Sequence, residues 1–372
     1  MKILIASGTF PPQLGGMATF VKNFSDTASA HGHQVAVVSY GERDGISDFG
    51  YDVHLVSRAR SLFARYYKYF QKLYALAPQY DLIFAQDLIS SGIPAAAASM
   101  FSGRKMVLRL GGDFLWEKMV QKGKCQLPIE EYYKSAKSLG ERIYLAFYHS
   151  VLSRAEKVVF NSELQASIYK RFFKITQDKL FVVENAVEGV RSKTHMPVQD
   201  RKNIVYAGRF IKLKNLPLFL EAVPNVPSEH KIVLFGEGPD EQELKSLVKS
   251  RGLEQRVEIR SSLDRQALAE YFAKSYLVVI PSLTEFNPHT ALEALHVGTP
   301  VLLTENNGLA FEVKNKLEQF DPTSLEDLTK ELKKLFDPKE YESYLRKIQN
   351  LEFHKSWQEV YDEYERILKS IK

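Results

Sequence analysis

Two glutamates, Glu285 and Glu293, stand eight positions apart in the segment from Thr284 to Leu295. The first follows an apolar run that ends at Pro281, and the second lies in a stretch of helical character. A loop that leads into a helix directs backbone N–H groups at one spot, which creates an anion-binding site. Carboxylates beside such a site can accept hydrogen bonds from sugar hydroxyls. The alternative is two solvated helix glutamates, but the apolar neighbours of Glu293 weaken it, because a carboxylate there is costly without a partner.

The elements that must position these residues are short apolar strands that alternate with helical patterns. Continuous β-branched runs are typical of strands buried on both faces of a parallel sheet, and their alternation with helices indicates βαβ units. Two such sets predict two doubly wound α/β domains, with a joint near 185–202 where the pattern is broken. A last helix over about 356–371 has an apolar stripe that must pack on a core. The predicted strands lie at 3–6, 35–39, 53–56, 82–85, 106–110, 158–160 and 180–183, and then at 204–207, 232–235, 257–259, 277–280 and 301–303.

The Glu285 to Glu293 segment resembles the Glu-x7-Glu motif of the retaining glycosyltransferase family 4, which has the GT-B fold. The resemblance spans almost the whole chain and is firmer in the second half. It implies two Rossmann-like domains that face each other across a cleft, with a C-terminal helix that returns toward the N-terminal domain. We expect an acceptor-binding domain over 1–185, a nucleotide-sugar-binding domain over 186–355 and the returning helix over 356–372. The other similar segments are Gly208-Arg209-Phe210 with Lys214-Asn215, Phe235 to Pro239 with Glu243-Leu244, Asn185-Ala186-Val187, and Phe10 to Pro12 with Gly15-Gly16.

The resemblance implies chemistry at a nucleoside diphosphate whose negative charge grows as the sugar leaves. Fixed cations directed at that charge stabilise the transition state more than the ground state. Arg209 can bind a phosphate in a forked way, and Lys214 can act as a point charge. Without this context, the pair could be a solvated basic turn. The chain contains no Asp-x-Asp pair, so we expect no metal, and Arg209, Lys214 and helix dipoles take its place.

The resemblance also implies which residues contact the donor. Glu293 takes the position of the ribose contact, and Glu285 takes that of the sugar contact, together with nearby N–H groups, although Pro288 has none to give. The Gly15-Gly16 loop resembles a loop whose backbone approaches the donor phosphate, where glycine is needed for a close approach. An ordinary turn is the alternative for two adjacent glycines. The remaining donor-binding candidates are Gly208, Gly236, Leu263, Phe286 and Asn287.

One departure from the family concerns the segment after the fifth strand. The family often has a histidine there, whereas this chain has Gly111, followed by Gly112 and Asp113. Asp113 is the remaining polar candidate beside the donor sugar, and we include it among the catalytic residues. A protein base is not strictly required, because enzymes of this type are thought to react on one face with the leaving phosphate deprotonating the acceptor.

Bulk properties exclude several classes of protein. The 372 residues suit two domains, and the single cysteine, Cys125, allows neither an internal disulfide nor a cysteine metal site. The start of the chain does not resemble a signal peptide, and the longest apolar stretch, 93–101, is too short to span a bilayer. These features predict a cytoplasmic protein. Residues 1–185 carry 23 Lys and Arg against 16 Asp and Glu, an asymmetry that indicates either an anionic partner or chance.

Residues 58–77 have the pattern of a basic, aromatic and amphipathic helix. Such a helix can lie on an anionic membrane surface, which would place the protein peripherally on the inner face of the membrane. The alternative, which we prefer slightly, is a helix with one face on the sheet and a solvated basic face. Arg171 to Lys174 form a smaller basic and aromatic cluster, but no nucleic-acid motif accompanies either segment. The basic and aromatic residues of the predicted helix are Arg58, Arg60, Arg65, Lys68, Lys72, Phe63, Tyr66, Tyr67, Tyr69, Phe70 and Tyr74.

The family resemblance implies a retaining hexosyltransferase without a cofactor, which uses a UDP-, GDP- or ADP-sugar as its donor, and the lack of an Asp-x-Asp pair favours independence of a metal. The expected acceptor is a saccharide or a lipid-linked glycan in the synthesis of cell-surface polysaccharide or glycoconjugate. An alternative is a non-catalytic sugar-nucleotide binder or membrane-surface scaffold of the same fold, which the missing histidine motivates. A dinucleotide-dependent enzyme is disfavoured, because Ser7 to Pro12 do not match the Gly-x-Gly-x-x-Gly pattern.

Overall fold

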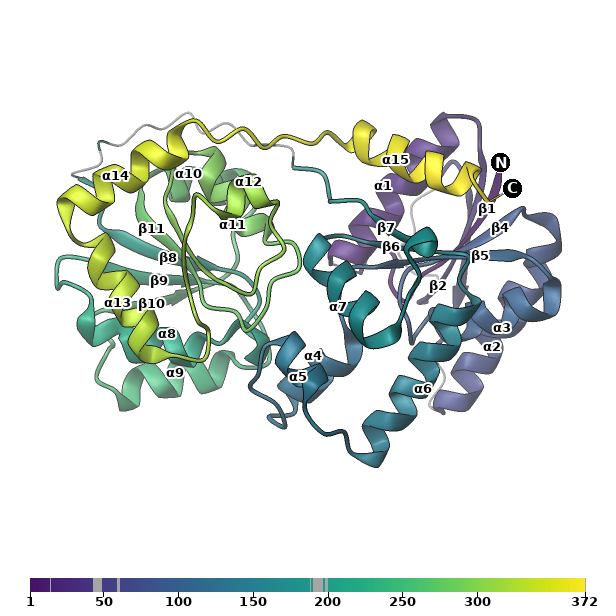
Figure 1. The fold of residues 1–372 in the computed structure, drawn as a ribbon, viewed down its shortest axis with the longest axis horizontal. Helices are drawn as coiled ribbons and strands as arrows, with labels where there is room; N and C mark the ends of the chain where they lie inside the picture. Colours follow the sequence, from purple (N-terminus) through teal and green to yellow (C-terminus); the bar gives the residue numbers. More distant parts are fainter. Residues whose placement is uncertain are drawn as a thin grey trace. The chain divides into compact units, whose positions relative to one another are not determined.

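The chain folds into two compact units, and each is made of more than one piece of the sequence (Figure 1). The computed structural model describes residues 1–13, 15–42, 49–58, 61–187, 189, 197 and 200–371. The first unit comprises Met1–Leu115, Ala136–Asn185 and Trp357–Lys372. The second unit comprises Trp116–Ser135 and Ala186–Ser356. Part of the predicted joint at 185–202 lies outside the described residues.

The first unit is built on a seven-stranded parallel sheet with the strand order β3-β2-β1-β4-β5-β6-β7. Helices α1 (Gly16–Ala30) and α15 (Trp357–Lys369) cover one face, and α2 (Leu62–Leu76), α3 (Gly92–Ser102) and α6 (Leu139–Arg154) cover the other (Figure 1). The unit also contains α7 (Glu163–Phe173). The strands are β1 (Lys2–Ala6), β2 (Gln34–Tyr40), β3 (Asp52–Val56), β4 (Leu82–Ala85), β5 (Lys105–Leu110), β6 (Lys157–Phe160) and β7 (Leu180–Val182).

The second unit has a six-stranded parallel sheet with the order β10-β9-β8-β11-β12-β13. Its strands are β8 (Asn203–Ala207), β9 (Lys231–Phe235), β10 (Val257–Arg260), β11 (Ser275–Ile280), β12 (Val301–Thr304) and β13 (Glu318–Phe320). Its helices from residue 216 onward are α8 (Leu216–Ala222), α9 (Glu241–Ser250), α10 (Arg265–Ala273), α11 (His289–His296), α12 (Phe311–Lys314), α13 (Leu325–Leu335) and α14 (Pro338–Gln349).

The strand pattern read from the sequence is confirmed at every predicted run, and together the two sheets confirm the predicted α/β fold class. The central strands are buried on both faces, because β-branched and other apolar side chains fill both sides of a parallel sheet. The sequence analysis missed β13, a three-residue edge strand of sequence Glu-Gln-Phe. An edge strand is held by hydrogen bonds to one neighbour, here β12, and needs no apolar run.

The C-terminal helix α15 packs on α1 in the first unit. The rings of Phe20 and Trp357 lie 5.6 Å apart, and those of Phe24 and Tyr361 lie 5.7 Å apart. The Trp357 indole N–H donates to the Thr27 hydroxyl at 2.8 Å. The apolar stripe predicted on this helix is therefore buried against a core.

The segment Trp116–Ser135 belongs to the second unit, although the prediction placed all of 1–185 in the first domain. It contains most of α4 (Phe114–Gln121) and all of α5 (Ile129–Lys134). The buried Trp116 packs edge-on against Phe286, with the ring centroids 6.4 Å apart. This aromatic contact holds the segment to the unit that follows it in the sequence, so the predicted boundary needs correction here.

None of the described helices combines the length and the apolar character that crossing a bilayer requires.

Candidate active site in the second unit

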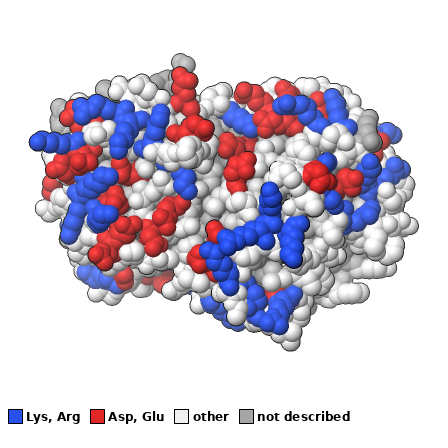
Figure 2. All heavy atoms as spheres, viewed as in Figure 1, with Lys and Arg blue, Asp and Glu red and all other residues white. Residues whose placement is uncertain are grey.

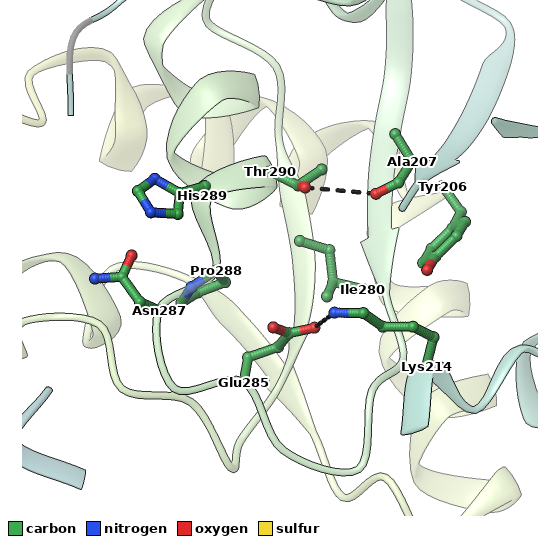
Figure 3. Close-up of a pocket in the computed structure, with 9 residues that line it drawn as sticks. All are labelled: Tyr206, Ala207, Lys214, Ile280, Glu285, Asn287, Pro288, His289 and Thr290. Atoms are coloured by element: carbon green, nitrogen blue, oxygen red, sulfur yellow. Dashed lines mark hydrogen bonds and ion pairs between the residues drawn. The ribbon is translucent and has the colours of Figure 1, made fainter. Parts of the chain in front are cut away.

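The pocket lies where the direction of strand addition reverses in the second sheet. β8 is the first strand of this sheet, β9 and β10 are added on one side of it, and β11 to β13 on the other. Ligands of doubly wound sheets bind outside the carboxyl ends of the strands at such a reversal. A cavity of about 160 Å³ lies there, which is room for a group much larger than one water. Its lining residues are Tyr206, Ala207, Lys214, Ile280, Glu285, Asn287, Pro288, His289 and Thr290 (Figure 3).

An ion pair between Lys214 and Glu285 lines the pocket. Figure 3 shows the two side chains pointing toward each other, with Lys214 Nζ 2.5 Å from Glu285 Oε1. The buried Ser282 hydroxyl donates to the same carboxylate oxygen at 2.5 Å. The side chains of Lys214 and Glu285 are 21% and 12% exposed, so they are shielded but reachable from the cavity. The structure thus brings together two of the predicted catalytic residues, 71 positions apart in the sequence.

The backbone around Glu285 is fixed by its neighbours. Its N–H donates to the Asn306 carbonyl oxygen at 2.9 Å, and its own carbonyl accepts from Gly308 N–H at 2.8 Å. Lys214 ends a short 3-10 turn, after which Asn215 adopts the left-handed conformation at φ 52°. A carboxylate and an ammonium held on fixed loops are preorganised, which is the condition for electrostatic stabilisation without reorganisation during a reaction.

Tyr206, which the sequence analysis did not select, also lines the pocket. Its hydroxyl donates to the Arg209 carbonyl oxygen at 3.0 Å. Burial, together with the nearby Glu285 carboxylate, raises the pKa of the Tyr206 hydroxyl well above its ordinary value. Tyr206 therefore stays a neutral donor at physiological pH and fixes the turn that carries Arg209.

Arg209 lies at the surface beyond β8 and is not among the residues that line the pocket. Within the described part of the chain, its guanidinium forms no ion pair, so the cation is available to an anion from solution. Lys214, in contrast, is neutralised by Glu285 in this structure. The two predicted phosphate-binding cations are thus in different states before any ligand arrives.

The predicted glycines Gly208 and Gly236 allow two loops to touch. A Cβ atom on Gly236 would lie 1.9 Å from the Gly208 carbonyl oxygen, a distance that no side chain can tolerate. Gly208 N–H donates to the Phe235 carbonyl at 3.0 Å, and Phe210 N–H donates to the Glu237 carbonyl at 2.9 Å. The loops after β8 and β9 therefore depend on glycine for their own packing, whatever they bind.

The start of α11 offers fewer N–H groups than the sequence analysis expected. Pro288 occupies the N-cap position and has no N–H. The N–H of His289 donates to the Asn287 carbonyl oxygen at 2.9 Å. Phe286, predicted to contact the donor, is buried against Trp116. The residues that line this end of the pocket include Asn287, His289 and Thr290, whose side chains are polar (Figure 3).

Glu293, on α11, forms an ion pair with Arg265 at the start of α10, with 3.0 Å between Oε1 and Nε. Burial raises the pKa of the Glu293 carboxyl above its ordinary value, and Arg265 partly offsets this effect. Leu263, another predicted donor contact, is 38% exposed in the loop before α10. Neither Glu293 nor Leu263 lines the pocket around Lys214.

The segment Trp116–Ser135 forms hydrogen bonds to three loops of this site. The sequence analysis did not predict these contacts. The Gln121 amide oxygen accepts from Lys212 N–H at 3.1 Å, and its amide nitrogen donates to Asp240 at 3.0 Å. One side chain therefore links the turn of Lys214 to the loop after β9. Ile129 N–H donates to the buried Thr284 hydroxyl at 3.1 Å, directly before Glu285.

Asp113, predicted as catalytic, is fully buried in the first unit. Its carboxylate accepts from the Tyr169 hydroxyl at 2.7 Å and from the Tyr148 hydroxyl at 3.4 Å. Tyr148 also accepts the Leu115 N–H at 2.8 Å. Asp113 thus accepts hydrogen bonds from two buried tyrosines, and we infer a structural role for it in place of the predicted catalytic one.

The other residues of the first unit that the sequence analysis discussed lie at the start of α1 and directly after β5. Gly15 is the N-cap of α1 at φ 143°, a conformation that favours glycine, and Gly16 begins the helix. Gly111 follows β5 and is exposed, with Arg109 beside it. Arg109 is buried, stacks 3.6 Å above the Phe20 ring and donates to the Tyr364 hydroxyl at 3.0 Å.

Comparisons with known proteins agree with this architecture. Two family models match adjacent parts of the chain: Glycosyltransferase Family 4 over residues 14–189 and Glycosyl transferases group 1 over residues 191–350. An uncharacterised glycosyltransferase of Methanocaldococcus jannaschii is 24% identical over 343 residues, which covers 85% of this chain and 84% of that protein. The putative teichuronic acid biosynthesis glycosyltransferase TuaC of Bacillus subtilis is 26% identical over 62% of this chain and 54% of its own length.

Solved structures share the fold over the whole chain. The sucrose-phosphate synthase of Thermosynechococcus elongatus has a TM-score of 0.73 at 18% identity, and covers 100% of this chain and 98% of its own. HepE of Anabaena, solved in complex with UDP, has a TM-score of 0.72 at 17% identity with full coverage of both chains. Together, the two family matches, the relatives and the shared fold support the assignment of this chain to the GT-B glycosyltransferases.

Proposed function

We propose that the protein is a retaining, metal-independent glycosyltransferase that moves a hexose from a nucleoside-diphosphate sugar to a saccharide or lipid-linked glycan acceptor. The single observation that carries this proposal is the Lys214–Glu285 pair in a pocket at the strand reversal of the second sheet. A neighbouring cation and carboxylate can serve two parts of one ligand, with Lys214 directed to a phosphate and Glu285 to a sugar hydroxyl. HepE, which shares the fold, was solved with UDP-glucose, and this supports a nucleotide-sugar donor.

In the proposed reaction, the bond between the anomeric carbon and the diphosphate oxygen breaks. The acceptor oxygen forms its new bond to that carbon on the same face, and its proton passes to the leaving diphosphate. Lys214 and Arg209 stabilise the negative charge that grows on the diphosphate. Glu285 orients the donor sugar, and Glu293 accepts hydrogen bonds from the ribose. No protein base is needed in this scheme, so it does not depend on Asp113 or on a histidine at Gly111.

The presence of Glu285 beside Lys214 also supports a catalytic role over a scaffold role. A protein that only bound sugar nucleotides could use any cation for the phosphate, with no carboxylate held against it. We further propose a role in the synthesis of cell-surface polysaccharide or glycoconjugate, to which relatives such as TuaC belong by name. An acceptor carried on a lipid would bring the protein to the inner face of a membrane.

A melting-temperature panel with UDP, GDP, ADP, CMP and NAD tests the donor. A ligand that binds only the folded state raises the melting temperature, so one diphosphate should produce a shift that Glu293→Ala weakens. The matching sugar nucleotides are then tested for slow hydrolysis and for transfer, with and without EDTA, and the anomeric configuration of the product is read by NMR. Donor binding without turnover on any acceptor would favour the scaffold, an inverted product would exclude retention, and loss of activity in EDTA would exclude metal independence.

A further inference from the structure

The outward side of α2 exposes large apolar side chains that the fold does not use. Phe63 is 81% exposed, Leu62 61% and Tyr67 51%. At the end of the adjacent helix α3, Met100 and Phe101 are 59% and 62% exposed. Side chains of this size in one contiguous area mark an interaction site more often than chance exposure does. We call the group of Leu62, Phe63, Tyr67, Phe70, Tyr74, Met100 and Phe101 the aromatic face.

The rings of the aromatic face form one continuous row. Phe63 and Tyr67 are stacked with their centroids 6.3 Å apart, and Phe70 and Tyr74 are stacked at 5.7 Å. Tyr67 and Phe70 link the two pairs at 6.5 Å, and Phe101 of α3 extends the row at 5.9 Å from Phe70. Residues spaced by three and four positions share one side of a helix. The row is thus a built surface across two helices, not a set of scattered side chains.

The core of the first unit does not need this row, because α2 has a separate inner face. Tyr69 and Leu73 are fully buried, and the Tyr69 hydroxyl donates to the Ser7 and Val38 carbonyl oxygens. The two residues of α2 that are fully buried therefore lie outside the aromatic face. The sequence analysis slightly preferred a solvated basic face for this helix, but the exposed side is aromatic at its centre and basic at its edge. The helix predicted over 58–77 spans Leu62–Leu76, and Arg60 lies outside the described residues.

The charge around the aromatic face has one sign. The charged residues of α2 are Arg65, Lys68 and Lys72, with no Asp or Glu among them, and α3 contains no charged residue. Lys68 is exposed on α2, one residue from Tyr67. In Figure 2 the area over α2, at the lower right, is largely uncharged. A basic margin around an apolar centre complements a surface that is anionic outside and apolar beneath.

We propose that the aromatic face binds the surface of an anionic lipid bilayer, with α2 lying in the plane of the interface. Tyrosine and phenylalanine rings would enter the boundary between headgroups and acyl chains, and Lys68 and Lys72 would remain at the level of the phosphates. With 15 residues, α2 is about 22 Å long, less than the roughly 30 Å of a bilayer core, so it lies on the membrane and does not span it. The inference adds a partner and a surface to the proposed function, but it rests on the first unit alone.

The experiment measures co-sedimentation of the full chain with vesicles of phosphatidylglycerol and of phosphatidylcholine at low and high salt. The test variant is Phe63→Ser/Tyr67→Ser, and its matched control is Phe311→Ser, which removes a 73% exposed phenylalanine from the second unit. Lys68→Gln/Lys72→Gln tests the charge, with Lys330→Gln/Lys333→Gln on α13 as its control. Because all of these side chains except Lys72 are exposed, we expect every variant to fold, which melting curves verify.

We expect the wild type to bind the anionic vesicles and to lose at least tenfold in binding with neutral lipid or at high salt. The aromatic variant should lose at least tenfold and the lysine variant about three- to tenfold, whereas both controls should bind as the wild type does. Equal binding by the aromatic variant and the wild type would overturn the proposal. So would a wild-type dimer in light scattering that only the aromatic variant disrupts, because the face would then join two copies. Donor hydrolysis is measured on the same samples, so a failure of membrane binding remains distinct from a failure of the proposed transfer reaction.

Discussion

Asp113 in the first unit and Glu285 in the second occupy similar positions in the sequence but different environments in the structure. Each follows a buried parallel strand within five residues, and each was a candidate for catalysis. Asp113 is fully buried and accepts hydrogen bonds from two tyrosines. Glu285 lies at a cavity and is paired with Lys214. A position just after a parallel strand thus places an acid at the edge of the sheet where ligands bind. Its hydrogen-bond and ion-pair partners then determine whether a substrate can contact it.

The largest effect is expected on the cavity side of this comparison, at Lys214, the ion-pair partner of Glu285. Lys214→Ala should lower kcat about 100- to 1000-fold, because a fixed group that stabilises charge in the transition state is lost. The measurement is kcat with the sugar nucleotide identified by the melting panel. Lys245→Ala is the matched control, since it removes a lysine of an exposed ion pair with Glu241 in the same unit. A Lys214 variant with wild-type kcat would contradict the site assignment.

The buried acid should respond in stability and not in chemistry. Asp113→Asn should lower the free energy of unfolding by about 1 to 3 kcal/mol, because buried hydroxyls lose a charged acceptor. Urea unfolding measures this change, and kcat per folded molecule should stay within about twofold of the wild type. Tyr169→Phe removes one of the same hydrogen bonds, and the two changes should be non-additive. An Asp113 variant that is fully stable but inactive would break the comparison.

A moderate effect is expected from Gln121, which joins the Lys214 turn to the Asp240 loop. Gln121→Ala should raise the donor KM by about three- to tenfold, with a smaller change in kcat, because the Lys212 N–H and the Asp240 carboxylate each lose a hydrogen bond. Steady-state kinetics with varied donor measure this split. Gln242→Ala, an exposed glutamine on α9, serves as the control. An unchanged KM would show that the segment Trp116–Ser135 does not position the site.

The smallest effect concerns pH and Glu293. Because burial raises the pKa of Glu293 in the folded protein, the native state takes up its proton at a higher pH than the unfolded chain does. This group therefore contributes most to stability below its unfolded pKa of about 4.3, and the contribution is lost as pH rises through the folded value. Glu293→Gln should consequently melt at a slightly higher temperature than the wild type at pH 8, and the gap should close toward pH 4. Melting curves over this pH range, without donor, test the expectation, and a constant gap would contradict it.

The strands could be predicted from local pattern, and the family resemblance placed Lys214 and Glu285 in one donor site, but the ion pair between them was not predicted. Strand ends at one edge bring their loops together, whatever fills the loops. The burial of Asp113 could not be predicted, because its partners come from helices 35 and 56 positions away. The sequence shows that α2 is rich in aromatic residues. It does not show which of these residues pack against the sheet and which are exposed.

The assignment of residues 116–135 to the second unit could not be read from the sequence either. These residues are joined covalently to the first unit at both ends, and their partners, Phe286, Asp240, Lys212 and Thr284, lie far along the chain. Contacts at such separation carry no local signal. The correction matters for the site, because this segment holds the loops on either side of Lys214.

The interrupted layout of the two units limits how the protein can be recombined with its relatives. A chimera cut at Asn185 would exchange the second unit without Trp116–Ser135 and would leave α15 attached to the wrong parent. Phe286 would then meet a foreign surface where Trp116 had packed, and α1 would face a foreign helix in place of Trp357 and Tyr361. A grafted second unit is therefore expected to work only when Trp116–Ser135 and Ala186–Ser356 are exchanged together and α15 stays with the first unit.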